Sequence, residues 1–200
     1  GIVYFRGVEA TVVNTVFKNN RVKHAGSIYI SKPTSSADGS LYVDNCTFEG
    51  NLATIGDGGA VYIVGSTEAN ITNSVFINNS AVKSQNNVGG RGSAVYIGGT
   101  PNVNIGSSIF VNNTGAYDSA IYVYGGKLTL ANSVLLNKAY DSTPAIFKGT
   151  SVYNNALNLN DNFWGDNTKA NVDAGIDVDR WVILDASYTE AENGELTITA

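Results

Sequence analysis

The amino-acid sequence predicts an all-β fold. We expect a right-handed parallel β-helix, a solenoid of about six rungs over residues 1–181, and then the start of a β-rich module over residues 182–200. Three observations lead to this prediction. A short phrase with an aromatic residue recurs every 25 to 34 residues, and a second phrase interleaves with it. The 22 glycine and 25 asparagine residues favour turns over long helices.

The first phrase is clearest in "DGGAVYIVG" from Asp57 and "RGSAVYIGG" from Arg91. In a coil that returns to its starting point, equivalent residues of successive turns lie about 4.8 Å apart. We expect Val61 and Ile63 to point inward, which places one tyrosine of each repeat in an aromatic stripe on the outer face: Tyr29, Tyr62, Tyr96 and Tyr122. The opposite orientation stays open, because Lys148 interrupts the apolar column that should face inward.

The second phrase, as in "ITNSVFINN" from Ile71, contains a large apolar residue that we expect to stack in the core. The predicted core stack is Phe17, Phe48, Phe76, Phe110, Leu135 and Phe163. The period-two alternation changes parity three residues earlier, which indicates a bend between two strands. Asparagine tolerates the left-handed backbone of such a bend. We expect these asparagines also to form a side-chain ladder: Asn14, Asn45, Asn73 and Asn132.

Each repeat therefore contains about three short strands without a helical pattern between them. A propeller blade is the alternative, but it needs four strands over about 40 residues, which is longer than these repeats. The only cysteine, Cys46, falls in a column of small residues, and we expect it to be buried and unreactive.

The charge excludes some partners. The net charge of −5 and the pI near 4.7 argue against nucleic acid, because phosphate binding requires clustered lysine and arginine.

No apolar run approaches the about 18 residues of a membrane span. We expect a monomeric fragment of a longer protein, because the chain begins inside a repeat and ends on the strand-like "ELTITA".

The phrases "GGAVYI" and "NSVFINN" resemble the GGA(I/L/V) and FxxN repeats of right-handed parallel β-helix adhesins. Polymorphic outer-membrane proteins and the adhesin-like surface proteins of methanogenic archaea contain such repeats. The tail is similar to the archaeal group, because "LNLNDNFWGDN" from Leu157 resembles a closing segment that precedes an immunoglobulin-like domain there. The resemblance implies display at the cell surface or in the cell wall and attachment to another cell surface or its glycans. It implies no catalytic residue, cofactor or metal.

The β-helix also supports polysaccharide lyases and hydrolases, so acidic residues need attention. Asp57, Asp118 and Asp141 precede the strand of the first phrase, and Arg91 takes the same place in one repeat. We interpret them as turn residues with partial charge pairing, since sugar hydrolysis requires carboxylates at defined separations. His24 is the only histidine, which makes a triad or a histidine metal site difficult to build. We therefore expect no enzyme.

Two further groups of residues are candidates for function. Trp164 and Trp181 could stack on sugars, but we favour a hydrophobic cap over the end of the coil. N-glycosylation sequons begin at Asn45, Asn70, Asn78 and Asn112. We expect Asn45 to stay unmodified because of its place in the predicted ladder.

Three functions are compatible with these patterns. The first is a surface adhesin segment, which an outward tyrosine stripe favours. The second is a passive stalk, which an inward tyrosine column favours. The third is a carbohydrate-active enzyme, which would require carboxylates that cluster in one groove.

Overall fold

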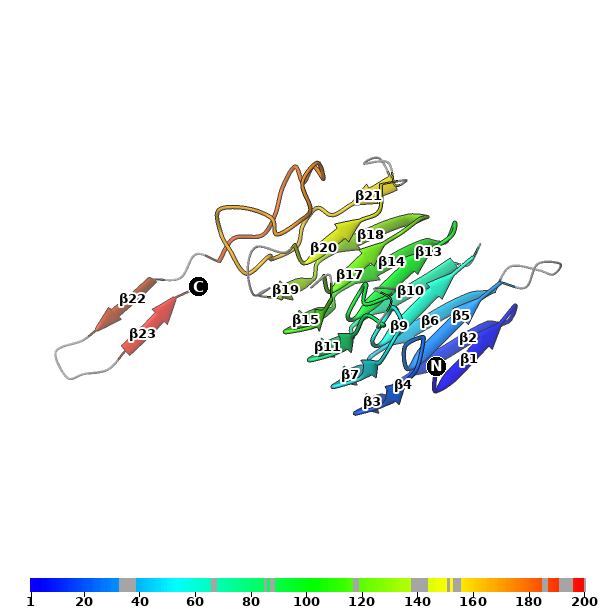
Figure 1. The fold of residues 1–200 in the computed structure, drawn as a ribbon. Coiled ribbons are helices and arrows are strands. Elements are labelled where there is room, and N and C mark those ends of the chain that lie inside the picture. Colours follow the sequence, from blue (N-terminus) through cyan, green and yellow to red (C-terminus); the bar gives the residue numbers. More distant parts are fainter. Residues whose placement is uncertain are drawn as a thin grey trace.

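The structure is a computed structural model of the 200-residue chain. It describes residues 1–32, 39–65, 68–84, 86, 89–116, 119–137, 144–150, 152, 156–184, 187–190 and 196–199. Successive coils stack into a parallel β-solenoid of the right-handed β-helix class, which confirms the predicted fold class. Figure 1 shows equivalent strands side by side along the rod, from β1 in blue to β20 in yellow.

Four parallel sheets run along the rod, one for each segment of the coil. Sheet A contains β1 (Val3–Arg6), β5 (Ile28–Ser31), β9 (Val61–Val64), β13 (Val95–Gly98), β17 (Ile121–Val123) and β20 (Ile146–Lys148). Sheet B contains β2 (Glu9–Val13), β6 (Ser40–Asp44), β10 (Glu68–Thr72), β14 (Asn102–Gly106), β18 (Lys127–Ala131) and β21 (Leu157–Asn158).

The other two sheets consist of shorter strands. Sheet C contains β3 (Val16–Lys18), β7 (Thr47–Glu49), β11 (Val75–Ile77), β15 (Ile109–Val111) and β19 (Val134–Leu136). Sheet D contains β4 (Arg21–Val22), β8 (Leu52–Ala53), β12 (Ser80–Ala81) and β16 (Thr114–Gly115). The sequence predicted three strands per repeat and missed sheet D, because a two-residue strand is too short for alternation to be visible.

The register of sheet A determines which residues are inside. Val61 pairs with Ile28 and Val95, and Ile63 pairs with Ile30 and Ile97. All of these side chains are completely buried, so the valine and isoleucine side chains face inward and the tyrosines between them face outward. Lys148 pairs with Val123 at the last rung, where it is half-buried.

The phenylalanine stack forms the centre of the core. The rings of Phe48 and Phe110 lie 4.7 Å from that of Phe76, nearly parallel to it, and Leu135 pairs with Phe110 on the next strand. At the last rung the structure differs from the predicted stack.

Phe163 does not continue the stack but bridges Val134 and is half-buried. The next residue, Trp164, is buried and takes the core position. The last repeat is one residue out of register with the earlier ones, so alignment on the phenylalanine selected the wrong aromatic residue.

The predicted bends are present. The backbone is left-handed at the corner between sheets B and C, with φ angles of 49° to 53° at Asn14, Asn45, Asn73, Ser107 and Asn132. The predicted ladder at this corner is wrong, because these side chains are exposed to water. Asn45 donates to Asn14 Oδ1 at 2.7 Å, but Asn73 donates to Asp44 Oδ1 instead.

The continuous asparagine ladder lies at the next corner, between sheets C and D. It consists of Asn20, Asn51, Asn79, Asn113 and Asn137. The side-chain amide of each donates to the Oδ1 of the ladder asparagine in the next coil, and the series ends at Asn137. Asn79 Nδ2 also donates to Phe48 O at 2.9 Å, and Asn79 Oδ1 accepts from the backbone and the side chain of Asn51. The Nδ2 and the Oδ1 atoms of each interior amide both form hydrogen bonds, as burial requires.

A column of small side chains, mostly serines, satisfies the backbone at the corner between sheets B and C. Ser74 Oγ accepts from Cys46 N, and Ser108 Oγ accepts from Ser74 N, both at 3.2 Å. Each of these serines donates to the carbonyl two residues earlier. Cys46 is buried in this column, where burial raises the pKa of its thiol.

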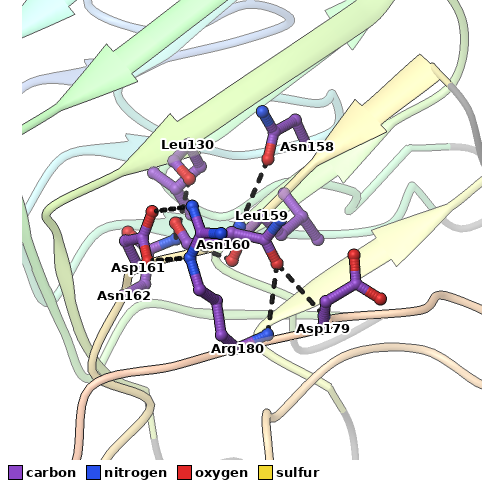
Figure 2. Close-up of polar contacts among 8 residues, drawn as sticks. All are labelled: Leu130, Asn158, Leu159, Asn160, Asp161, Asn162, Asp179 and Arg180. Atoms are coloured by element: carbon purple, nitrogen blue, oxygen red, sulfur yellow. Dashed lines mark hydrogen bonds and ion pairs between the residues drawn. The ribbon is translucent and has the colours of Figure 1, made fainter.

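The segment after β21 covers the end of the coil. Figure 2 shows Arg180 paired with Asp161 through two hydrogen bonds of 2.6 and 2.8 Å, while Asn160 Oδ1 accepts from the backbone of Asp179 and Arg180. Trp164 is buried in the core cluster, and Trp181 packs against it from a half-buried position. This is the arrangement expected of a hydrophobic cap.

The last strands, β22 (Ser187–Glu190) and β23 (Leu196–Thr199), pair with each other as an antiparallel hairpin. A two-stranded hairpin is marginally stable by itself. The division at residue 181 into a β-helix and a second module stays a prediction.

We expect Phe76→Ala to lower the free energy of unfolding by about 3–5 kcal/mol, because the cavity lies between two stacked rings in a completely buried site. Ile109→Ala, on the outward side of the neighbouring strand, should cost less than about 1 kcal/mol. Urea unfolding of the two variants checks this, and similar losses for both would contradict the stack.

We expect Asn79→Leu to cost at least about 3 kcal/mol, because it leaves the backbone N–H of Asn51 and the carbonyl of Phe48 buried without a partner. Asn73→Gly should stay within about 1 kcal/mol, since glycine accepts the φ of 49° at that exposed corner. The midpoints of urea unfolding separate the two cases. An equal loss in both variants would show that the ladder is at the wrong corner.

Candidate functional site: an aromatic stripe on sheet A

One aromatic side chain projects outward from each strand of sheet A. These residues form a column in register across the sheet, which we call the aromatic stripe: Tyr4, Tyr29, Tyr62, Tyr96, Tyr122 and Phe147. The alternation of side chains along each strand puts them outside because the flanking valine and isoleucine residues face the core.

The rings of the stripe contact one another along its whole length. Tyr62 and Tyr96 stack with their centroids 4.7 Å apart and an interplanar angle of 6°. Tyr4 stacks on Tyr29 at 4.5 Å, whereas Tyr29 meets Tyr62 edge-on at an angle of 81°. Stacked rings turn their faces to each other, so most of the stripe presents ring edges and hydroxyl groups to water.

Two of the predicted binding tyrosines are buried. Tyr96 is 4% exposed and Tyr122 is 7% exposed. The guanidinium of Arg91 lies 5.3 Å from the ring centre of Tyr96, and the ring of Tyr124 stacks beside Tyr96 at 6.4 Å. A stripe exposed at all four tyrosines is therefore incorrect, since these neighbours cover its centre.

The accessible parts of the stripe are its first three residues and Phe147, and the exposed Tyr124 lies beside Tyr96. Tyr4 is exposed, and its hydroxyl group forms a hydrogen bond of 2.9 Å with Ser31 Oγ. Tyr29 and Tyr62 are half-buried. Periodicity did not reveal Tyr124, because it follows the strand β17 and has no aromatic equivalent in the earlier coils.

A bidentate ion pair borders the buried centre of the stripe. Arg91 Nη2 lies 2.6 Å from Asp57 Oδ2, and Arg91 Nε donates to Asp57 Oδ1 at 3.0 Å. The side chain of Asp57 is 8% exposed and that of Arg91 is 24% exposed. The sequence placed both residues at one edge of the coil. The structure buries Asp57 and half-buries Arg91, which gives a stronger contact than the exposed pairing that we expected.

Burial raises the pKa of two tyrosines of the stripe. It raises the pKa of Tyr62 to about 12, and the nearby negative charge of Asp57 contributes in the same direction. The pKa of Tyr96 is raised as well, mainly by burial, although Arg91 opposes this. The hydrogen bonds that Arg91 donates to Asp57 raise the pKa of Arg91 above its ordinary value. Tyr62 and Tyr96 thus carry uncharged hydroxyl groups at neutral pH.

Among the residues that the structure describes, the other candidates do not gather into a site. Asp118 and Asp141 lie outside the described residues, and His24 is exposed at the end of a short strand. Within the described ranges, no group of three histidine, cysteine or acidic side chains is placed to hold a metal ion. In the same part of the chain, there is no helix with the length and apolar character to cross a bilayer.

Residues 45–64 match the sequence model of the Chlamydia polymorphic membrane protein repeat (Chlamydia_PMP). This span extends from the corner at Asn45 through β7 and β8 to β9, which is most of one coil. No curated protein and no solved structure matches the chain. The similarity therefore supports the predicted relation to polymorphic membrane protein repeats at one coil, and the archaeal resemblance stays a prediction.

We expect Arg91→Ala to lower the free energy of unfolding by about 3 kcal/mol, because it leaves the carboxylate of Asp57 buried without its counter-ion. The paired change Asp57→Asn with Arg91→Gln should recover much of this loss, since no charge is then left alone. Thermal and urea unfolding test both variants. A single variant as stable as the wild type would show that the pair is effectively exposed.

Proposed function

We propose that this chain is a segment of a surface-displayed adhesin that attaches to another cell surface or its glycans. The observation that carries this proposal is the column of aromatic residues on the outward side of sheet A, where the core does not require them. The repeat match to a polymorphic membrane protein family supports a place at the cell surface.

The accessible tyrosines suit a binding role. A tyrosine side chain offers a large contact area with few rotatable bonds, and its hydroxyl group can donate or accept a hydrogen bond. Tyr29 and Tyr62 meet edge-on, so this junction is where the regular stacking of the stripe is interrupted. We place the contact with the partner here, together with the exposed Tyr4.

A passive stalk is the second candidate, and the stacking itself favours it. The stripe contacts mostly itself, and its two central tyrosines are buried. Such a column stabilises the rod whether or not a partner binds, because cross-strand aromatic pairs stabilise sheets.

We also propose that the segment does not catalyse a reaction on its partner. The carboxylate of Asp57 is held by the guanidinium of Arg91 and by the backbone N–H of the same residue. A general acid or base must instead reach its substrate within hydrogen-bond distance. These contacts support binding as the main activity.

The double variant Tyr29→Ala with Tyr62→Ala should bind target cells and a glycan array at least about tenfold more weakly, since each lost aromatic contact is expected to cost about 1 kcal/mol or more. Tyr42→Ala is the matched control, because Tyr42 is an exposed tyrosine on sheet B, away from the stripe. A melting curve of each variant shows that the fold is retained.

The same experiment separates the candidate functions. No binding by the wild type, or equal binding by all variants, would favour the stalk. Release of new sugar ends from a polysaccharide panel, abolished by Asp57→Asn, would favour an enzyme.

A further inference from the structure

The outer face of sheet C is apolar over three neighbouring strands. The outward residues of β11, β15 and β19 form a patch that we call the apolar face: Val75, Ile77, Ile109, Val111, Val134 and Leu136. Ile109 is 39% exposed and Leu136 is 40% exposed. The other four residues are half-buried. A contiguous apolar patch that is accessible to water marks a surface that another group contacts.

Two exposed asparagines border this face. Asn78 directly follows Ile77, and Asn112 directly follows Val111. Both have a left-handed backbone, with φ angles of 53° and 49°, and both are exposed. Within the described residues, neither side-chain amide takes part in a hydrogen bond, so each is open to modification.

Both asparagines begin an Asn-x-Ser/Thr sequon, and the two sequons lie one above the other. Ser80 pairs in register with Thr114, and the middle residues Asn79 and Asn113 belong to the buried ladder. The corner does not require a hydroxyl residue at the third position. The first two coils have Arg21 and Leu52 there.

The other two sequons are less open. Asn45 donates its amide to Asn14 Oδ1 at 2.7 Å. Asn70 lies within β10, where its Oδ1 accepts from Asn104 at 3.0 Å, and it is half-buried. The structure thus divides the four sequons into two groups. The side chains of Asn45 and Asn70 form hydrogen bonds, and those of Asn78 and Asn112 form none within the described residues.

We propose that Asn78 and Asn112 carry N-linked glycans that cover the adjacent apolar face. This inference rests on the proposed display at the cell surface, since exported proteins are the ones that carry glycans at such sequons. The donor is a lipid-linked glycosyl phosphate or diphosphate. The bond from the sugar C1 to the phosphate oxygen breaks, a bond from C1 to the side-chain Nδ2 forms, and Nδ2 loses one proton while the phosphate leaves with the bonding electrons.

The geometry of the corner supports a covering role. A sugar on Asn78 or Asn112 begins next to Ile77 or Val111, and the face extends from there across sheet C. The C–H groups of pyranose rings can lie on aliphatic side chains while the sugar hydroxyl groups stay in water. The apolar area is thereby removed from solvent without a protein partner.

Glycopeptide mass spectrometry of the protein isolated from the cells that produce it tests the assignment. We expect sugar mass on the peptides that contain Asn78 or Asn112 and none on the peptide that contains Asn45. Unmodified asparagine at both positions 78 and 112 would overturn the proposal.

The double variant Ser80→Ala with Thr114→Ala tests the covering role, because it removes both sequons and keeps the corner asparagines. We expect increased binding of a dye for apolar surfaces and increased self-association compared with the wild type. Thr47→Ala, which removes the sequon at Asn45, is the matched control and should change neither. Unchanged dye binding in the double variant would refute the covering role. A wild type with both glycans that binds no target cell would count against the adhesin function and leave the glycan assignment intact.

Discussion

The in-register pairing of each strand with the equivalent strand of the next coil is the constraint on which the rest of the structure depends. It places each residue over its counterpart one coil away, so that Phe48, Phe76 and Phe110 stack on each other and the tyrosines of sheet A do the same. A parallel ladder leaves no freedom to shift by one residue, since a shift would turn every apolar side chain to the outside. The core, the stripe and the apolar face all follow from this single rule.

Asparagine has two separate roles in this rod. At the corner between sheets B and C it adopts the left-handed backbone and remains exposed. At the corner between sheets C and D it is buried, and its amide satisfies backbone groups of the neighbouring coil. The two roles occur within one repeat, as Asn73 and Asn79 show, and together they account for nine of the 25 asparagines without any reference to a ligand.

Periodicity in the sequence was sufficient to predict the coil and the bends. It favoured inward valine and isoleucine columns but left the opposite orientation open, since Lys148 interrupts the column. It could not choose between two asparagine columns, because both repeat with the same period and only burial distinguishes them. It also selected Phe163 over Trp164, since a single-residue change of spacing is invisible to an alignment on residue type. Arg91 and Tyr124 cover Tyr96 through side-chain contacts between different coils. A repeat pattern does not encode such contacts.

The hydrogen bonds between coils all point along the axis of the rod. Tension applied to its two ends therefore loads the coils in series, so every joint between coils carries the same force and the weakest joint opens first. The ion pair between Asp57 and Arg91 joins the coil of β9 to the coil of β13 at their turns. This ion pair thus reinforces one joint near the middle of the rod, and opening under load would begin at another joint along it.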